Sequence, residues 1–271
     1  NTATGAGTIV AVIDTGVDES HPEFSETNKF VDGYNFVADN GETHDDNGHG
    51  THVAGIIAAA SNNLEGAAGV APDCHIMPIK VLNNNNLGSW SDVASGILEA
   101  VNRGAHVLNL SLGASSDPPD AVREAIEVAA SQAVVVAAAG NAASSRPFYP
   151  AAYDGVIAVA GLNQSGLRWI PSNYGDWVTI AAPAENIYAA ANGGGYETRS
   201  GTSMATGFVS GAAAIVHQTG TTGPGAITQS LTSSARAIVG GDATNRGLGA
   251  GVVDALMAID GGDKIFIPFI T

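Results

Sequence analysis

The sequence has few cysteines, few basic residues and no long apolar run. Its one cysteine, Cys74, cannot form an internal disulfide, and we expect it to be a small buried hydrophobic residue. No run of about 18 or more apolar residues is present, which excludes a membrane-spanning helix. No charged leader precedes an apolar stretch near residue 1, so we expect a mature or trimmed form of the protein.

Charged side chains are also scarce, at 13% of 271 residues, where soluble domains typically have about 25%. The 10 Lys and Arg residues stand against 26 Asp and Glu residues, which gives a formal charge of −16. Without clustered basic side chains the chain is not expected to bind nucleic acid. The acidity favours solubility, an acidic or saline habitat, or binding of cations such as Ca²⁺, and it does not identify a substrate.

Hydrophobic residues, at 45%, are sufficient for a substantial core. Short runs of Val, Ile and Ala alternate with segments of helical period, a pattern typical of a mostly parallel sheet covered by helices on both faces. The sequence therefore predicts a three-layer α/β fold in one domain. The expected strands are residues 8–13, 75–81, 106–111, 133–139, 156–160 and 178–181. The expected helices are residues 53–60, 93–101, 121–129 and 203–216, and residues 83–86 and 193–195 are expected loops, the second one mobile.

Three short motifs each place one chemically active residue at the edge of a regular element. A serine hydroxyl becomes a nucleophile when an imidazole accepts its proton, and the imidazole needs a carboxylate to orient it. Asp14, His49 and Ser203 supply these three groups. They lie in residues 12–16 (VIDTG), 49–55 (HGTHVAG) and 200–205 (SGTSMA).

A fourth segment, residues 137–141 (AAAGN), ends an expected strand with a glycine and an amide. The amide of Asn141 can donate a hydrogen bond to the oxyanion of a tetrahedral intermediate. Ligands of open parallel sheets bind beyond the carboxyl ends of the strands. Asp14, Ser111 and Asn141 all lie at or just after such ends, so we expect the motifs to converge at one edge of the sheet.

At these motifs the chain resembles the subtilisin-like serine proteases, from about residue 5 to about residue 258. The order Asp, His, Ser is one of three unrelated orders in which this constellation occurs. The resemblance implies a secreted, extracellular and monomeric serine endopeptidase that cleaves protein or peptide substrates through an acyl-enzyme on Ser203, with a propeptide as a candidate inhibitor. It also implies one catalytic domain over residues 1–271. Its core would be residues 1–258, and residues 259–271 an extension that packs on the body.

The resemblance further implies a groove in which substrate adds as an extended strand to residues 86–88 and 111–113. Trp90 would line the pocket for the fourth residue before the cut, although an exposed aromatic could also be simple packing. Residues 142–148 would close the primary pocket, where an inward Phe148 predicts a preference for medium apolar side chains; Phe148 or Arg146 could instead turn outward. The expected substrate-binding residues are Gly88, Trp90, Ser111, Leu112, Gly113, Ala138, Gly140 and Phe148.

Calcium is the cofactor that the resemblance implies. Residues 61–72 resemble the calcium loop of the family, although the N-terminal segment that normally contributes a ligand is almost entirely missing before residue 5. Oxygen-only ligands suit Ca²⁺, and a polar loop without a metal is the alternative. Asp45 and Asp46 could hold a second ion or form a solvated turn. The expected calcium ligands are Glu23, in place of the usual Asp, with Ser61, Asn63, Glu65 and Ala67.

Three alternatives remain open from the sequence. Gly207 stands where the family usually has Pro, and a shifted Ser203 could favour a transpeptidase or ligase that uses the same acyl-enzyme. A metal hydrolase could use His44, His49 and His52 with the Asp45–Asp46 pair, although no zinc-protease motif is present. A non-catalytic binding module could also retain the fold.

Overall fold

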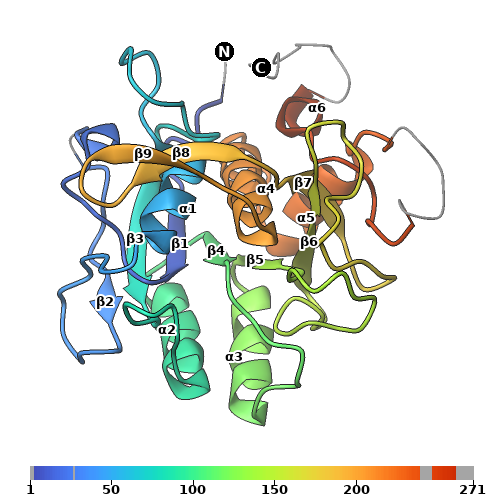
Figure 1. Ribbon diagram of the computed structural model, residues 1–271, viewed down its shortest axis with the longest axis horizontal. Helices are drawn as coiled ribbons and strands as arrows, with labels where there is room; N and C mark the ends of the chain where they lie inside the picture. The colour runs from blue at the N-terminus through green and yellow to red at the C-terminus, as the bar shows by residue number, and fades with distance from the viewer. Residues whose placement is uncertain (1–2, 27, 239–245, 261–271) are drawn as a thin grey trace.

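The computed structural model describes residues 3–26, 28–238 and 246–260. A seven-stranded sheet lies between two layers of helices (Figure 1), which is the expected α/β architecture. The packing expected for the tail, residues 263–271, lies outside the described residues. Within those ranges, none of the helices combines the length and apolarity that crossing a bilayer requires.

Every neighbouring pair of strands in the large sheet is parallel. The chain builds one side of β1 first and then crosses to the other side, so the strand order reverses at β1 and β4. Ligands bind at such a reversal, beyond the carboxyl ends of the strands. In sheet order the strands are β2 (Tyr34–Asn35), β3 (His75–Lys80), β1 (Ile9–Asp14), β4 (Val107–Leu110), β5 (Val134–Ala138), β6 (Val156–Leu162) and β7 (Ile180–Pro183).

The strands are buried on both faces because successive apolar side chains point to opposite helical layers. In β1, Val10 and Val12 contact one core cluster, whereas Ala11 and Ile13 contact the other. This explains why the strands read in the sequence as continuous apolar runs. A strand with one solvated face would instead alternate apolar and polar residues.

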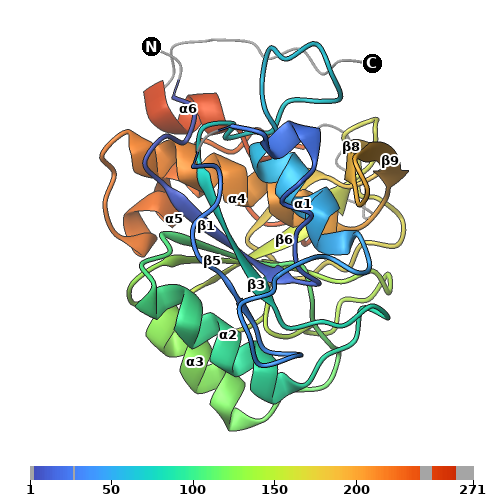
Figure 2. The same ribbon diagram turned by 90° about the vertical axis from the view of Figure 1, so that its left-hand side faces the viewer.

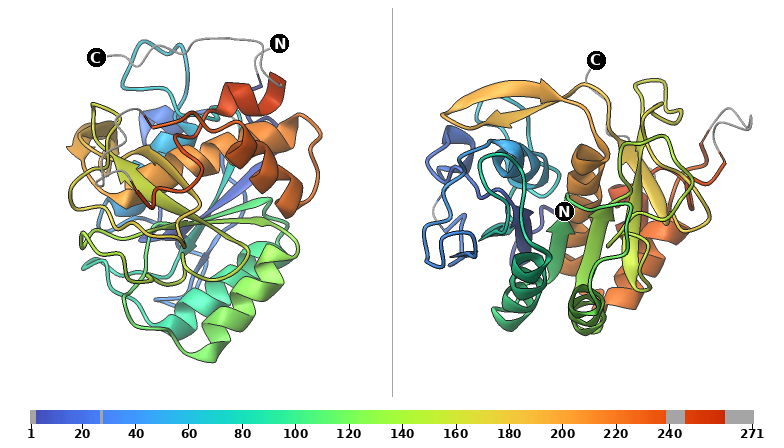
Figure 3. Two further views of the ribbon diagram at one scale, coloured as in Figure 1. Left: turned by 90° about the vertical axis from the view of Figure 1, so that its right-hand side faces the viewer. Right: turned by 60° about the horizontal axis from the view of Figure 1, so that its bottom comes forward.

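Different helices cover the two faces of the sheet (Figures 2 and 3). α1 (His49–Ala58) and α4 (Thr202–Gln218) lie on one face, and α5 (Pro224–Ser233) and α6 (Ala255–Asp260) pack against α4. α2 (Trp90–Asn102) and α3 (Asp120–Ala130) lie side by side on the other face. α1 and α4 contact each other directly, which brings the His49 and Ser203 motifs to neighbouring helix ends.

A separate antiparallel hairpin, β8 (Ile187–Ala191) and β9 (Gly195–Arg199), crosses above α1 and leads the chain into α4 (Figure 1). Its turn contains Gly193 and Gly194, with φ of 92° and 88°, in the left-handed region that favours glycine. The segment expected as a mobile loop is therefore the hairpin turn and the start of β9. Asp18 accepts from the Gly193 N–H at 2.9 Å, and His21 Nε2 lies 2.7 Å from the Gly195 carbonyl, so side chains near α1 hold the hairpin.

Candidate active site

Asp14 and His49 form the acid–base part of the site. Asp14 is the last residue of β1 and fully buried, and its Oδ1 lies 2.7 Å from His49 Nδ1. The Thr15 N–H donates to the same oxygen at 2.8 Å. The carboxylate thus fixes the imidazole through Nδ1, and Nε2 remains for the cavity that His49 lines.

The charge of Asp14 also sets the basicity of His49. Burial by itself disfavours the imidazolium, but the neighbouring carboxylate outweighs it and raises the pKa of His49 above its ordinary value. Arg199 opposes this increase in pKa, and Asp45 adds to it. An imidazole of raised pKa accepts a proton more readily, as a general base requires.

Asp45 shapes the start of α1 through hydrogen bonds to both of its carboxylate oxygens. Its two carboxylate oxygens accept from Thr15 Oγ1 and from the N–H groups of Asn47, Gly48 and Thr51, at 2.8 to 3.0 Å, and from Thr51 Oγ1 at 2.6 Å. Burial would raise the pKa of Asp45, but these hydrogen bonds hold it below the usual value. The carboxylate therefore accepts from the N–H groups of Gly48, the N-cap residue, and of Thr51 in the first turn, and so fixes the start of the helix bearing His49.

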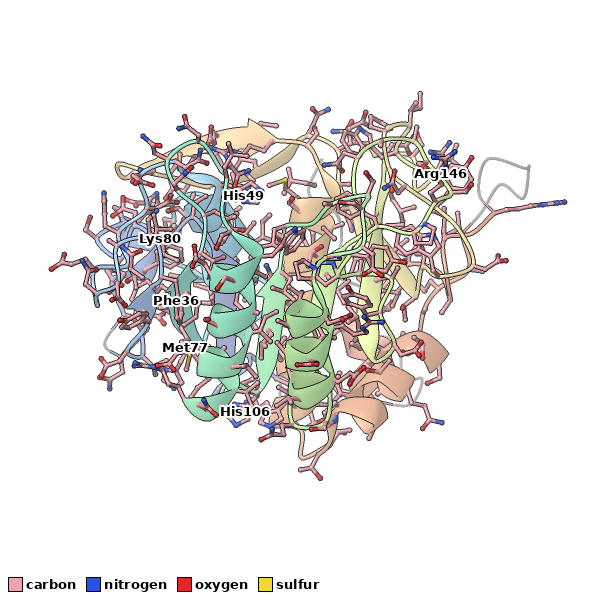
Figure 4. All side chains as sticks on the ribbon, turned by 90° about the horizontal axis from the view of Figure 1, so that it is seen from below. Phe36, His49, Met77, Lys80, His106 and Arg146 are labelled. Carbon is pink, nitrogen blue, oxygen red and sulfur yellow. The ribbon has the colours of Figure 1, made fainter. Side chains whose placement is uncertain are left out.

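Lys80 ties together the segments around the site. It ends β3, is 4% exposed, and lies near His49 at the same edge of the sheet (Figure 4). Its ammonium group donates to the Thr15 carbonyl at 2.5 Å, to Asp46 at 2.7 Å and to the Leu82 carbonyl at 3.1 Å. Because an ammonium has three N–H donors, all are used. Asp46 is thus paired with a lysine.

Ser203 lies in the first turn of α4, and its backbone and side chain are tied to Ser111. Ser203 Oγ donates to the Ser111 carbonyl at 3.2 Å, while Ser111 Oγ donates to the Ser203 carbonyl at 3.0 Å. No hydrogen bond between Ser203 and His49 is recorded among the described residues. Both side chains line one cavity of about 740 Å³, so the hydroxyl must turn from Ser111 to reach the imidazole.

Asn141 follows β5 and faces the same cavity. Its Oδ1 accepts from Thr202 N and from Thr202 Oγ1, both at 2.9 Å. A backbone N–H can only donate, so this contact identifies the oxygen and leaves the amide N–H₂ for the cavity. A donor in this position can bind the developing oxyanion of an acyl-transfer reaction.

The cavity brings together the residues expected to bind substrate. All eight of the predicted residues line it. Sequence reasoning missed two further contributions. Thr202 donates to Asn141 and holds its side chain, and Arg199, at the end of β9, lines the cavity. The identity of the Thr residue in the 200–205 motif could have signalled the first. The position of Arg199 depends on where the β8–β9 hairpin lies, and no local sequence pattern predicts that position.

Phe148 lines the cavity beside Gly113 and Gly140. A Cβ built on Gly113 would lie 2.5 Å from the Phe148 ring, and one built on Gly140 would lie 3.0 Å from it, so the ring packs between these two walls. Phe148 therefore points inward. Arg146 lies in the same loop and is exposed, far from His49 (Figure 4).

One of the expected calcium ligands is a buried carboxylate in contact with another, Asn63. Glu23, in the 3-10 helix Pro22–Phe24, is fully buried, and it accepts from Tyr196 Oη at 2.8 Å and from Asn63 Nδ2 at 2.9 Å. The carbonyls of Ser61, Glu65 and Ala67 accept no recorded hydrogen bond within the described residues. Leu64 is fully exposed with φ of 66°, a strained conformation that persists where surroundings fix a loop. This oxygen-rich donor set fits Ca²⁺.

The structure removes the residue-level arguments for two of the sequence alternatives, the transpeptidase or ligase and the metal hydrolase. Gly207 packs on α1, since a Cβ there would lie 3.1 Å from an Ile56 methyl group, so close helix contact explains the glycine. His52 is buried, its Nε2 lies 3.3 Å from the Glu197 carbonyl, and burial lowers its pKa to about 4. Across the described residues, no group of three His, Cys, Asp or Glu side chains could hold a metal ion, which contradicts the metal-hydrolase reading.

Comparisons with known proteins give a consistent result. A sequence model described as the subtilase family matches residues 5–251. Thermitase of Thermoactinomyces vulgaris is 42% identical over 219 residues, which cover 80% of this chain and 77% of thermitase. The thermophilic serine proteinase of Bacillus sp. (strain AK1) is 44% identical over 216 residues, 79% of this chain. The match spans only 53% of that longer relative.

Solved structures agree with the sequence comparisons. A protease from Pseudoalteromonas arctica PAMC 21717 superimposes with a TM-score of 0.87 at 30% identity, over 96% of this chain and 91% of that one. A cold adapted subtilisin-like serine proteinase gives a TM-score of 0.79 at 34% identity, over 93% of this chain and 88% of the other. The similarity thus extends over nearly the whole length of both folds.

Proposed function

Because the chain belongs to the subtilase family, we propose that it is a serine endopeptidase that hydrolyses peptide bonds of protein substrates. The observation that carries the proposal is the 2.7 Å contact between Asp14 and His49 at a cavity that Ser203 and the Asn141 amide also line. A carboxylate, an imidazole, a hydroxyl and an oxyanion donor are the groups that acyl transfer requires.

In this mechanism His49 Nε2 takes the proton of Ser203 Oγ as that oxygen attacks the peptide carbonyl carbon. Asp14 stabilises the resulting imidazolium, and the Asn141 N–H₂ and the N–H groups at the start of α4 bind the oxyanion. As the intermediate collapses, the C–N bond breaks and His49 gives its proton to the leaving amine. Water, activated by the same imidazole, then hydrolyses the ester on Ser203.

Phe148 supports a proposal for the residue on the acyl side of the cut bond. Its ring occupies the space between Gly113 and Gly140 that a deep pocket would leave open. A large aromatic side chain would have to displace this ring, whereas a small or medium apolar one would fit above it. The proposed substrates therefore carry small or medium apolar residues before the cut.

A structural calcium ion is proposed at residues 61–67. Glu23, Asn63 and the carbonyls of Ser61, Glu65 and Ala67 would hold it, and the ion would stabilise the loop without taking part in the chemistry. By family resemblance we also propose a secreted enzyme. Detecting the protein in the culture medium of its source organism, rather than in the cells, tests that proposal.

Labelling with a fluorophosphonate tests the proposed chemistry. The protein is expected to gain one covalent adduct on the peptide that contains Ser203 and to cleave a mixed peptide library. Ser203→Ala should lose both properties, and Ser20→Ala, at a serine outside the cavity, should retain them. A folded protein without an adduct would favour the non-catalytic binding module.

A further inference from the structure

The cavity contains one guanidinium. Arg199 is the only Arg or Lys among the described residues that line it, in a chain whose formal charge is −16. Arg199 ends β9, at the point where the hairpin leads into α4 (Figure 1). Its side chain is 27% exposed, so the guanidinium is accessible from the cavity.

The guanidinium lies against the start of α1. A Cβ built on Gly48, the residue before His49, would lie 3.1 Å from Arg199 Nη2. Arg199 Nε and Nη2 both contact Glu197 Oε1, at 2.8 and 2.7 Å. A guanidinium has five N–H donors in one plane. Arg199 therefore retains donors for a second carboxylate while it stays anchored to Glu197.

The chemistry places Arg199 on the leaving side of the cut bond. His49 protonates the leaving amine, so the leaving fragment must begin over the imidazole and pass its neighbour Gly48. The acyl fragment occupies the other side, along residues 86–88 and 111–113. Arg199 touches Gly48 and thus faces the first residues of the leaving fragment.

We propose that Arg199 selects substrates with Asp or Glu at the first or second position after the cut bond. This inference rests on the proposed endopeptidase function. Contact with a carboxylate adds charge-assisted hydrogen bonds of defined geometry. The distant negative charges of the protein are screened beyond about 8 Å at physiological ionic strength. These distant charges are therefore weak, and the donors that Glu197 leaves free on Arg199 attract a substrate carboxylate.

Peptides that differ only at these two positions test the proposal, with Asp compared against the isosteric Asn at a fixed pH. The ratio of kcat/KM for Asp over Asn is expected to be about five in the unchanged enzyme, because half-exposed charge pairs have modest effects. Arg199→Leu should reduce the ratio to one or below. Glu197→Gln, which removes the competing carboxylate, should increase it.

Arg103→Leu is the matched control, because Arg103 pairs with Glu99 at similar exposure, 34% and 31%, on α2 outside the cavity. It should keep the ratio of the unchanged enzyme. A ratio of one before mutation, or a preference that survives Arg199→Leu, would overturn the proposal. A role exercised only through the pKa of His49 would change both peptides by one factor and would also overturn it. Cleavage of no peptide at all would instead contradict the endopeptidase function.

Discussion

At the scale of single residues, one aromatic ring shapes the proposed primary pocket. Gly113 and Gly140 leave space between the two walls of the pocket, and Phe148 fills that space. The sequence could place a phenylalanine in the closing segment, but it could not decide which way the ring points. That direction depends on contacts with residues distant in the chain.

Phe148→Ala should therefore deepen the pocket. We expect kcat/KM for a peptide with Phe before the cut, relative to one with Ala, to increase about tenfold or more, because pocket volume discriminates by this order. Peptides that vary only at that position provide the measurement. Phe36→Ala, at a half-buried phenylalanine that packs on Tyr34 away from the cavity, is the control. An unchanged preference in Phe148→Ala would show that the ring does not limit the pocket.

The sequence motifs named the four candidate groups that the structure brings together, Asp14, His49, Ser203 and Asn141, but not the contacts that orient them. The residue types in these motifs indicate their proposed chemistry. Three contacts join segments that come together only after folding: Thr202 with Asn141, Ser111 with Ser203, and Arg199 with the cavity. Local sequence patterns carry no information about contacts between distant segments.

At the scale of elements, α4 is built to lie close to its neighbours. A Cβ on Gly211 would lie 2.6 Å from Val70 Cβ, whereas one on Gly225 in α5 would meet nothing within 4 Å. Both glycines have helical neighbours, so only the available space differs.

Gly211→Ala and Gly225→Ala should therefore have opposite effects on the free energy of unfolding. Gly211→Ala overpacks the core and should lower it by about 1–3 kcal/mol. Gly225→Ala should increase it by about 0.5–1 kcal/mol, because alanine loses less backbone entropy in a helix. Urea denaturation measures both. A stabilising Gly211→Ala would mean that Val70 moves aside without cost.

The loop at residues 61–67 provides the test of calcium. Binding at 100 times Kd adds about 2.7 kcal/mol to stability, so the melting temperature with Ca²⁺ should exceed that with EGTA by about 5 °C or more. Glu23→Gln should remove most of this difference, while Glu124→Gln on the exposed face of α3 should retain it. Equal melting temperatures with Ca²⁺ and EGTA would reject the site.

The strands and helices that bury apolar residues in the core could be predicted from the sequence. Six of the expected strands correspond to strands of the large sheet, and the four expected helices to α1 through α4, with bounds that shift by a few residues. The β8–β9 hairpin was not predicted, because its strands lie on the surface and carry no two-sided apolar pattern. α5 was also missed, because it buries only two apolar residues, Ile227 and Leu231, which are too few to indicate a helix.

At the scale of the whole molecule, buried and half-buried histidines couple stability to pH. Burial lowers the pKa of His52 to about 4 and also lowers the pKa values of His106 and His217. The unfolded chain then binds more protons than the folded one below about pH 6.5, so stability decreases as the pH falls from there to about 4. The raised pKa of His49 acts in the opposite direction.

Melting temperatures at pH 7, 6, 5 and 4 measure this coupling. His52 alone should contribute on the order of 3 kcal/mol between pH 6.5 and 4, so His52→Gln should make the decrease shallower. His44→Gln, at an exposed histidine, should leave the slope unchanged. A pH profile that is the same with and without His52 would assign the acid lability to other groups.

The reactive side chains enter the chain at very different times during synthesis. A ribosome releases Asp14 and His49 well before Ser203, and the serine reaches the site only when α4 packs against α1. A chain that ends before α4 therefore has the proposed general base but lacks the proposed nucleophile. The proposed proteolytic activity thus depends on the docking of α4, the last long helix among the described residues.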